Sequence, residues 1–294
     1  PELIGLILGA MLLSLFRGEF SVRGGSAPMT RFLLGFFVMI GCLMFLGCPF
    51  RTVLRLAGGD FNAIFGLLGF ICGIVAGIYF LNRGYSLKRS YQQTRPEGLV
   101  LPAIQLVFLV LVLAAPAFIF FTKEGPGAKH AAVLISLLAG LLVGALAQHT
   151  RMCMVGGIRD FILFREPKLL IGFCMIFVAA FLANLMSGHF HPGFADQPVA
   201  HTESLWNFLG MLLAGYGCCL LGGCPLRQMV MAGEGNTDSA VTYLGLFVGA
   251  AFAHNFALAS SGKGSTPNGR IAVILGLVVV TVIAVSNTFN KKEA

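Results

Sequence analysis

RFLLGFFVMIGCLMFLGCPFR at residues 31–51 and NFLGMLLAGYGCCLLGGCPLR at residues 207–227 are two copies of one motif. They align at a shift of 176 residues (207 − 31). The identical pairs are Gly41/Gly217, Cys42/Cys218, Gly47/Gly223, Cys48/Cys224, Pro49/Pro225 and Arg51/Arg227. Each copy continues through an Ala-Gly and acidic turn into a further apolar stretch. The chain therefore contains an internal repeat, and its fold depends on what this motif does to a helix.

The composition around the motif is that of a membrane protein. Of the 294 residues, 57% are hydrophobic and only 11% are charged, against about 25% charged residues in a soluble domain. The 38 Gly residues suit closely packed membrane helices. The net charge of +8 is typical of basic cytoplasmic loops in such a protein, so no nucleic-acid partner is expected. These features exclude a water-soluble enzyme and a disordered chain.

Apolar runs predict an all-α fold, a polytopic transmembrane helical bundle. The expected segments are residues 3–16, 32–46, 61–81, 99–121, 131–147, 169–186, 205–221, 240–259 and 271–289. Several are shorter than the about 20 residues of a full span. The segments that end in Gly-Cys-Pro are expected to stop within the membrane.

The Cys-Pro motifs predict broken helices. Proline cannot continue a helix but suits the first turn of a new one. Gly47 and Gly223 are expected to permit the sharp change of backbone direction before Cys48-Pro49 and Cys224-Pro225. The free N–H groups of the new helix attract an anion, and Arg51 or Arg227 adds a permanent charge in its first turn. A thiol at such a break suits a soft sulfur or selenium anion.

Charge sets the expected orientation. With Arg83, Lys88, Arg89 and Arg95 in the cytoplasm, most Lys and Arg residues fall inside, Arg227 among them. Arg51 and the loop 188–204 then fall outside. The two motif copies therefore face opposite sides, which is the inverted repeat of many transporters.

The repeat also defines the expected domains. Residues 1–130 form the first repeat with a connecting helix, and residues 131–294 form the second, inverted repeat. Residues 3–16 align with the helix from Leu169, since LIG stands at 3–5 and at 170–172. Nothing in the first half matches residues 131–147 and RMCMVGGIRD at 151–160. We therefore expect that the first repeat lacks its N-terminal helix and Cys hairpin.

Several further polar residues are weighed as site residues. Cys153 is interpreted as a third thiol of the substrate path, with Arg159 and Asp160 as an ion pair or gate brace. His254 lies inside an apolar segment, where polar groups tend to face cavities. The alternative for the motif cysteines is a structural role beside helix kinks. The alternative for the two motif arginines is pairing with Asp60 and Asp238.

The remaining cysteines and histidines are expected to have no role in the site. Cys42 and Cys218 lie six residues before the motif cysteines, on another helix face, so a disulfide or metal pair is not expected. Cys72, Cys174 and Cys219 are interpreted as packing residues. The loop histidines His189, His191 and His201 lack nearby cysteines or carboxylates, so no metal site is predicted. No nucleotide or catalytic motif occurs, so neither a cofactor nor enzymatic activity is expected.

The motif-bearing stretches resemble the YeeE/YedE family of membrane proteins, and within it the YedE-type selenium transporters. The similar stretches include FLGCPFR, LRLAGGD, RMCMVGGIRDFILF, LLGGCPLRQ, GEGNTDSA and FVGAAFAHNFALASS. Members of the wider family take up thiosulfate along a path lined with cysteines from both repeats. The resemblance implies that Cys48, Cys153 and Cys224 line such a path, and that the substrate is a selenium compound or a thiosulfate-like anion.

Taken together, the residues and the resemblance predict a multi-pass protein of the bacterial inner membrane that imports a small selenium- or sulfur-containing anion. The alternative is a membrane thiol protein that relays sulfur or selenium covalently to a cytoplasmic carrier protein. A purely structural subunit of a membrane complex is a third reading. The predicted partners are thus the anion, the lipid bilayer and, under the alternative, the carrier.

Overall fold

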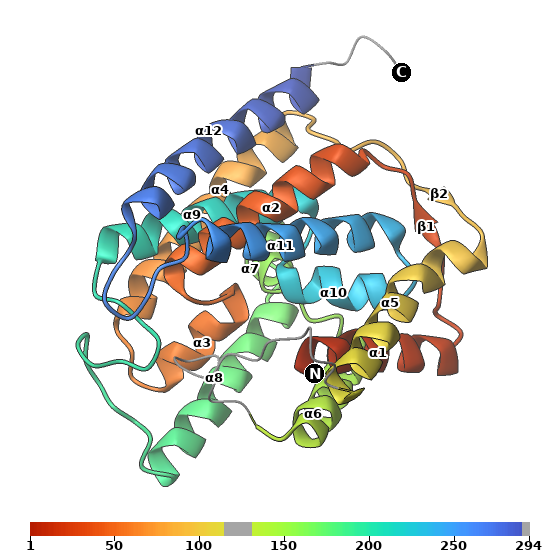
Figure 1. The fold of residues 1–294 in the computed structure, drawn as a ribbon. Coiled ribbons are helices and arrows are strands. Elements are labelled where there is room, and N and C mark those ends of the chain that lie inside the picture. Colours follow the sequence, from red (N-terminus) through yellow and green to blue (C-terminus); the bar gives the residue numbers. More distant parts are fainter. Residues whose placement is uncertain (115–130, 290–294) are drawn as a thin grey trace. The chain divides into compact units, whose positions relative to one another are not determined.

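The computed structural model describes residues 1–114 and 131–289, and these residues are almost entirely helical (Figure 1). The helices are α1 (Glu2–Phe16), α2 (Pro28–Phe45), α3 (Pro49–Ala57), α4 (Asn62–Asn82), α5 (Arg95–Ala114), α6 (Val133–Thr150), α7 (Met154–Phe164), α8 (Lys168–Met186), α9 (Ser204–Leu221), α10 (Pro225–Gly233), α11 (Thr237–Asn255) and α12 (Pro267–Phe289). The short strands β1 (Arg23–Gly24) and β2 (Tyr91–Gln92) pair antiparallel.

Within the described residues, each of the nine predicted apolar segments contains a helix, which confirms the all-α fold class. Seven stretches are long and apolar enough to cross a membrane within the part of the chain that is described. They are Pro28–Ala57, Asn62–Asn82, Arg95–Ala114, Val133–Phe164, Lys168–Met186, Ser204–Gly233 and Pro267–Thr288, and Glu2–Phe16 is a shorter apolar helix. The predicted end of segment 99–121 lies outside the described residues.

The chain divides into two units, which we describe separately. Unit 1 contains Pro1–Ser26, Arg89–Met152 and Arg227–Val241. Unit 2 contains Ala27–Lys88, Cys153–Leu226 and Thr242–Ala294. Unit 1 therefore holds α1, α5, α6 and most of α10, whereas unit 2 holds α2–α4, α7–α9, most of α11 and α12.

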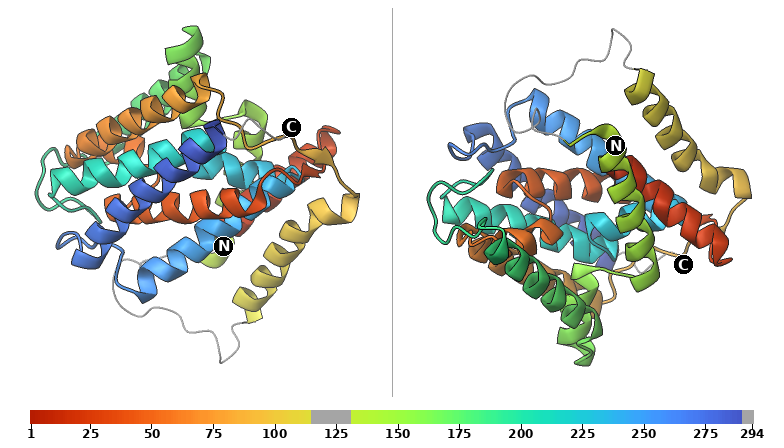
Figure 2. Two further views of the ribbon diagram at one scale, coloured as in Figure 1. Left: turned by 90° about the horizontal axis from the view of Figure 1, so that it is seen from above. Right: turned by 90° about the horizontal axis from the view of Figure 1, so that it is seen from below.

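In unit 2, α9 is the central helix. It packs along α4 on one side and α2 on the other, as the views in Figures 1 and 2 show. The α4–α9 contact is very close, since a Cβ at Gly73 would collide with the carbonyl oxygen of Leu212. Twelve of the 18 residues of α9 are buried, whereas in α8 Phe173 alone is buried. The small residues of α4 and α9 therefore create the core that positions the Cys-Pro motifs.

In unit 1, α1 packs against α6 through the same kind of contact. A Cβ at Gly9 would collide with the carbonyl oxygen of Leu141, and a Cβ at Gly144 with that of Leu6. Both glycines belong to pairs four residues apart, Gly5 with Gly9 and Gly140 with Gly144, so each pair lies on one helix face. Backbone contact of this closeness is typical of small-residue interfaces between membrane helices.

The internal repeat extends into backbone geometry. The turns after α3 and α10 both place a glycine at φ +97°, Gly59 in one copy and Gly235 in the other. In unit 2, His191 N donates to Gly58 O at 3.0 Å. In unit 1, Ser21 N donates to Glu234 O at the same distance, and residue 234 is the repeat partner of residue 58. Each short helix is thus followed by the same turn, which is held by the loop after α8 in the first copy and by the loop after α1 in the second.

Candidate functional site

Both Cys-Pro motifs break a helix, as the sequence predicts. In the first copy α2 ends at Phe45 and α3 begins at Pro49. In the second copy α9 ends at Leu221 and α10 begins at Pro225. Proline takes the first helical position in both, where its missing N–H has no bond to make. Cys48 and Cys224 are therefore the residues from which the short helices start.

The change of backbone direction occurs one residue earlier than predicted. The left-handed residues are Leu46, at φ 62°, and Gly222, at φ 80°, and not Gly47 and Gly223. The helices end with a six-residue cap, in which Gly47 N donates to Cys42 O at 2.9 Å and the repeat-equivalent amide of residue 223 donates to Cys218 O at 3.1 Å. The expectation for the two glycines is wrong because the cap geometry requires positive φ at the position after the last helical turn.

Gly47 has a different role, which the structure makes visible. A Cβ at this position would lie 3.1 Å from Cδ of Arg51. The absence of a side chain at residue 47 therefore leaves the room in which the Arg51 side chain packs back over the break.

Each of the three candidate thiols stands at the start of a short helix, and all three cysteines belong to unit 2. Cys153 caps α7, and its Sγ accepts a hydrogen bond from Gly156 N at 3.3 Å. Cys48 caps α3 and lies beside the free backbone N–H groups of Phe50 and Arg51. Cys224 directly precedes α10 and is buried. Helix N-termini carry partial positive charge, so all three sulfur atoms lie where an anion is favoured.

In the structure, cysteines that were expected to have no role in the site lie close to two of the candidate thiols. The thiol of Cys218 is fully buried and lies within electrostatic range of Cys42, Cys48, Cys153 and Cys219. Two of the candidate thiols, Cys48 and Cys153, thus lie near Cys218 although they come from distant parts of the sequence. We call Cys42, Cys48, Cys153, Cys218 and Cys219 the thiol cluster. All eight cysteines are free, and no group of three metal-ligating side chains occurs among the residues described.

The packing role expected for Cys72 and Cys174 is wrong. Both side chains are exposed, on α4 and α8, whereas Cys219 is buried as expected. Helical periodicity alone does not fix which face of an all-apolar helix is turned to the core. These two cysteines therefore supply controls that lie outside the thiol cluster.

Arg51 is a half-buried cation without a carboxylate partner. Among residues 1–114 and 131–289, no acidic side chain forms an ion pair with it. The alternative pairing with Asp60 does not occur, because Asp60 binds Arg55 instead. The guanidinium group of Arg51 therefore keeps its hydrogen-bond donors available beside Cys48.

Arg55 forms a buried ion pair that the sequence analysis missed. Its Nε donates to Asp60 Oδ2 at 2.6 Å, and its Nη1 donates to the Phe45 carbonyl at 2.6 Å. The guanidinium also lies 4.0 Å from the centre of the Phe45 ring. Asp60 Oδ1 in turn accepts from the backbone and side-chain amides of Asn62. Arg55 thus satisfies a carbonyl that the break leaves free at the end of α2.

His201 satisfies the neighbouring carbonyl. Its buried ring donates from Nε2 to Met44 O at 2.8 Å, and its own carbonyl accepts from Asn207 Nδ2 at 3.0 Å. Burial holds the pKa of His201 below its usual value, although the Met44 carbonyl and the carboxylate of Glu203 act in the opposite direction. The loop between α8 and α9 therefore stabilises the break between α2 and α3.

The second motif arginine differs from the first. In unit 1, Arg227 Nη1 lies 3.2 Å from Glu234 Oε1, so Arg227 is ion-paired. The alternative partner, Asp238, instead accepts hydrogen bonds from the backbone N–H groups of Gly25 and Ser26 at 2.9 and 3.0 Å. Position 234 lies seven residues after Arg227, on the same face of a helix, and this spacing is the signal that could have identified the pair.

The structure also places three further predicted residues, Arg159, Asp160 and His254. Arg159 and Asp160 form the expected ion pair, with Nε of the arginine 2.9 Å from Oδ1 of the aspartate. His254 lies at the exposed C-terminal end of α11, and the structure does not bring it to the thiol cluster. The candidate site is therefore defined by Cys48, Cys153 and Cys224, which lie in unit 2, rather than by this histidine.

A helical bundle with several candidate membrane spans and thiols at broken helices defines a class, the multi-pass membrane proteins with intramembrane helix breaks. Residues 149–290 match the family model described as Sulphur transport, which is the YeeE/YedE sulphur transport family. The match confirms the predicted resemblance to the YeeE/YedE family over this part of the chain and supports a sulfur-related membrane transporter. No curated protein matches the chain significantly.

Proposed function

We propose that this protein imports a small anion with a soft sulfur or selenium atom across the bacterial inner membrane, along a path lined by Cys48, Cys153 and Cys224. The observation that carries the proposal is that each of these cysteines lies in unit 2 and directly precedes the first turn of a short helix. The match to the sulphur transport family supports the sulfur chemistry.

The chemistry of the three positions suits such an anion. A thiol donates a weak hydrogen bond and its sulfur is polarisable, so it can contact a terminal sulfur or selenium atom. The helix N-terminus behind it offers unpaired backbone N–H groups and about half a positive charge. Each contact is weak by itself, and a transported ion must leave each position after binding it.

Arg51 supports recognition of charge. A half-buried guanidinium without a carboxylate partner attracts an anion from the aqueous side, and its planar fork of donors matches two oxygen atoms. Thiosulfate and selenosulfate both present oxygen atoms at one end and a soft atom at the other. We propose that Arg51 takes the oxygen end while Cys48 faces the soft atom.

Uptake into proteoliposomes tests this function. Purified protein is reconstituted, and entry of thiosulfate labelled at the outer sulfur is compared with entry of selenosulfate and sulfate. We expect entry of at least one soft anion and exclusion of sulfate. Cys48→Ala, Cys153→Ala and Cys224→Ala should each reduce uptake at least tenfold, whereas the exposed-site controls Cys72→Ala and Cys174→Ala should keep it.

Two outcomes would contradict the proposal. Equal loss in all five variants, at equal amounts of folded protein, would mean that the cysteines matter for packing alone. A persulfide trapped on a motif cysteine during turnover would indicate the relay function instead. In that reaction the thiolate attacks the outer sulfur of thiosulfate, the new S–S bond replaces the old one, and sulfite leaves.

A further inference from the structure

The two arginines of the repeated motif have different electrostatic surroundings, although they occupy the same position of the motif. Arg51 has no acidic partner among the residues that the structure describes. Arg227 faces Glu234 with both arms of its guanidinium group, at 3.2 Å and 3.4 Å. The repeat partner of Glu234 is Gly58, so the first copy has no side chain in this place.

Glu234 is shared between two cations. Its Oε1 also lies 3.3 Å from Nη1 of Arg151, the C-cap residue that follows α6 and stands two positions before Cys153. The side chains of Arg227 and Glu234 are 14% and 12% exposed, so the pair is largely shielded from water. All three residues lie in unit 1, and Glu234 can keep the Arg151 contact when the Arg227 contact opens.

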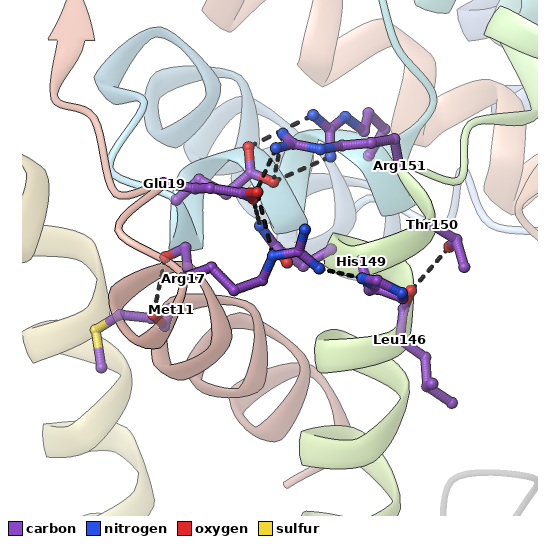
Figure 3. A network of polar contacts seen from close by, with 11 residues as sticks. Met11, Arg17, Glu19, Leu146, His149, Thr150 and Arg151 are labelled. Carbon is purple, nitrogen blue, oxygen red and sulfur yellow. Dashed lines mark hydrogen bonds and ion pairs between the residues drawn. The ribbon is translucent and has the colours of Figure 1, made fainter.

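Glu19 anchors Arg151 from the other side. Figure 3 shows its carboxylate between Arg17 and Arg151. The carboxylate oxygens lie 3.1 Å from Arg17 Nε and 2.8 Å from Arg151 Nη2. The hydrogen bond from Gln148, at 2.7 Å, lowers the pKa of Glu19, and the charges of Arg17 and Arg151 lower it further. Glu19 is therefore a fixed anion that keeps Arg151 in place.

The charges of this group do not cancel. Three guanidinium groups, those of Arg17, Arg151 and Arg227, face the two carboxylates of Glu19 and Glu234. One positive charge remains, so an added anion is attracted to the group. The Arg227–Glu234 contacts are also longer than the 2.6 Å of the buried Arg55–Asp60 pair, which suits a contact that opens.

We propose that Glu234 is a built-in competitor of the transported anion at Arg227. This inference rests on the proposed function. The anion reaches Arg227 when the Glu234 carboxylate moves away onto Arg151, and the returning carboxylate displaces the anion. Arg227 consequently binds the anion more weakly than it would without Glu234, which favours release of the anion on the predicted cytoplasmic side.

Binding measurements on purified protein test this competition. Thiosulfate is titrated against thermal stability, with sulfate as the control salt, in an Arg51→Gln background that leaves Arg227 as the motif arginine. We expect Glu234→Gln to lower the apparent dissociation constant about tenfold, because the competing charge is removed. Glu19→Gln is the matched control in the same group, and it should lower stability without tightening thiosulfate binding.

The outcomes separate this inference from the function on which it rests. Unchanged or weaker thiosulfate binding by folded Glu234→Gln protein would show that Glu234 is a structural partner only. If Glu234→Gln does not fold, Glu234→Asp keeps the charge but shortens its reach, and it should also tighten binding. A wild-type protein that neither binds nor transports thiosulfate or selenosulfate would overturn the proposed function itself.

Discussion

At the scale of single residues, Arg51 is the clearest test of anion recognition. Arg51→Gln removes the charge while it keeps much of the size and some hydrogen-bonding capacity. A hydrogen bond to a charged group contributes about 1.5–3 kcal/mol, which corresponds to roughly a 10- to 100-fold weaker anion affinity. Arg51→Lys should retain part of the affinity, because the charge remains and the fork is lost.

Uptake and thermal stability have to be measured together on the Arg51 variants. Loss of uptake at an unchanged melting temperature supports the anion role. Normal uptake per folded molecule in Arg51→Gln would remove this arginine from the substrate path. A fall in melting temperature alone would point to a role in packing over Gly47.

His201 predicts a pH dependence of stability. Burial holds its pKa in the folded protein below the usual 6.5, and the charged groups that act on it are Glu203, Asp60 and Arg55. As pH falls below 6.5, the unfolded chain takes up a proton that the folded protein resists, so stability decreases. The slope contributed by one such group is at most about 1.4 kcal/mol per pH unit.

The melting temperature between pH 7.5 and pH 5 measures this effect. His201→Gln keeps a donor for the Met44 carbonyl but cannot titrate, so its melting temperature should depend less on pH. His189→Gln is the control, because His189 is an exposed residue of the same loop. The same slope in wild type and His201→Gln would assign the pH dependence to other groups.

At the scale of elements, the break between α2 and α3 depends on the Arg55–Asp60 pair. Asp60→Asn leaves the Arg55 guanidinium buried without its counter-ion, and uncompensated charges of this kind cost about 3–5 kcal/mol. Asp160→Asn is a matched control, because the Arg159–Asp160 pair is 26–28% exposed and should contribute less than about 1 kcal/mol. Unfolding in detergent measures both variants, and losses of equal size would contradict this assignment.

The helix breaks of the two motif copies have different polar partners. The end of α2 is held by Arg55 and His201, two residues that lie outside α2 itself. The start of α10 instead carries Arg227, whose charge is met by Glu234 at the end of the same helix. An identical motif therefore acquires different polar partners from the elements around it.

At the scale of the whole molecule, charge predicts which loops face the cytoplasm. Lys88 belongs to a loop predicted to lie inside, and Ala195 to a loop predicted to lie outside, and both are exposed. In a Cys72→Ala/Cys174→Ala background, an impermeant maleimide applied to intact cells should label Ala195→Cys protein and not Lys88→Cys protein. Labelling of Lys88→Cys from outside would overturn the orientation.

The contacts within each unit agree with this orientation. Arg17, Arg151 and Arg227, all predicted to lie inside, meet around Glu19 and Glu234 in unit 1. The turn after α3 and the loop at 191–193, both predicted to lie outside, are joined by backbone hydrogen bonds in unit 2. Segments that contact one another within a unit are thus predicted to lie on the same side of the membrane.

The sequence by itself determined the helices, the repeat and the breaks at Cys48 and Cys224. Hydropathy depends on composition, and a proline lacks the N–H group that the interior of a helix uses, so Cys-Pro after glycine favours the start of a new helix. Tertiary structure alone decided that Arg55 pairs with Asp60, that Arg51 has no acidic partner in the described chain, and that Cys72 is exposed. These outcomes depend on which helix faces meet, and a chain that is apolar on every face does not encode that choice in its local pattern.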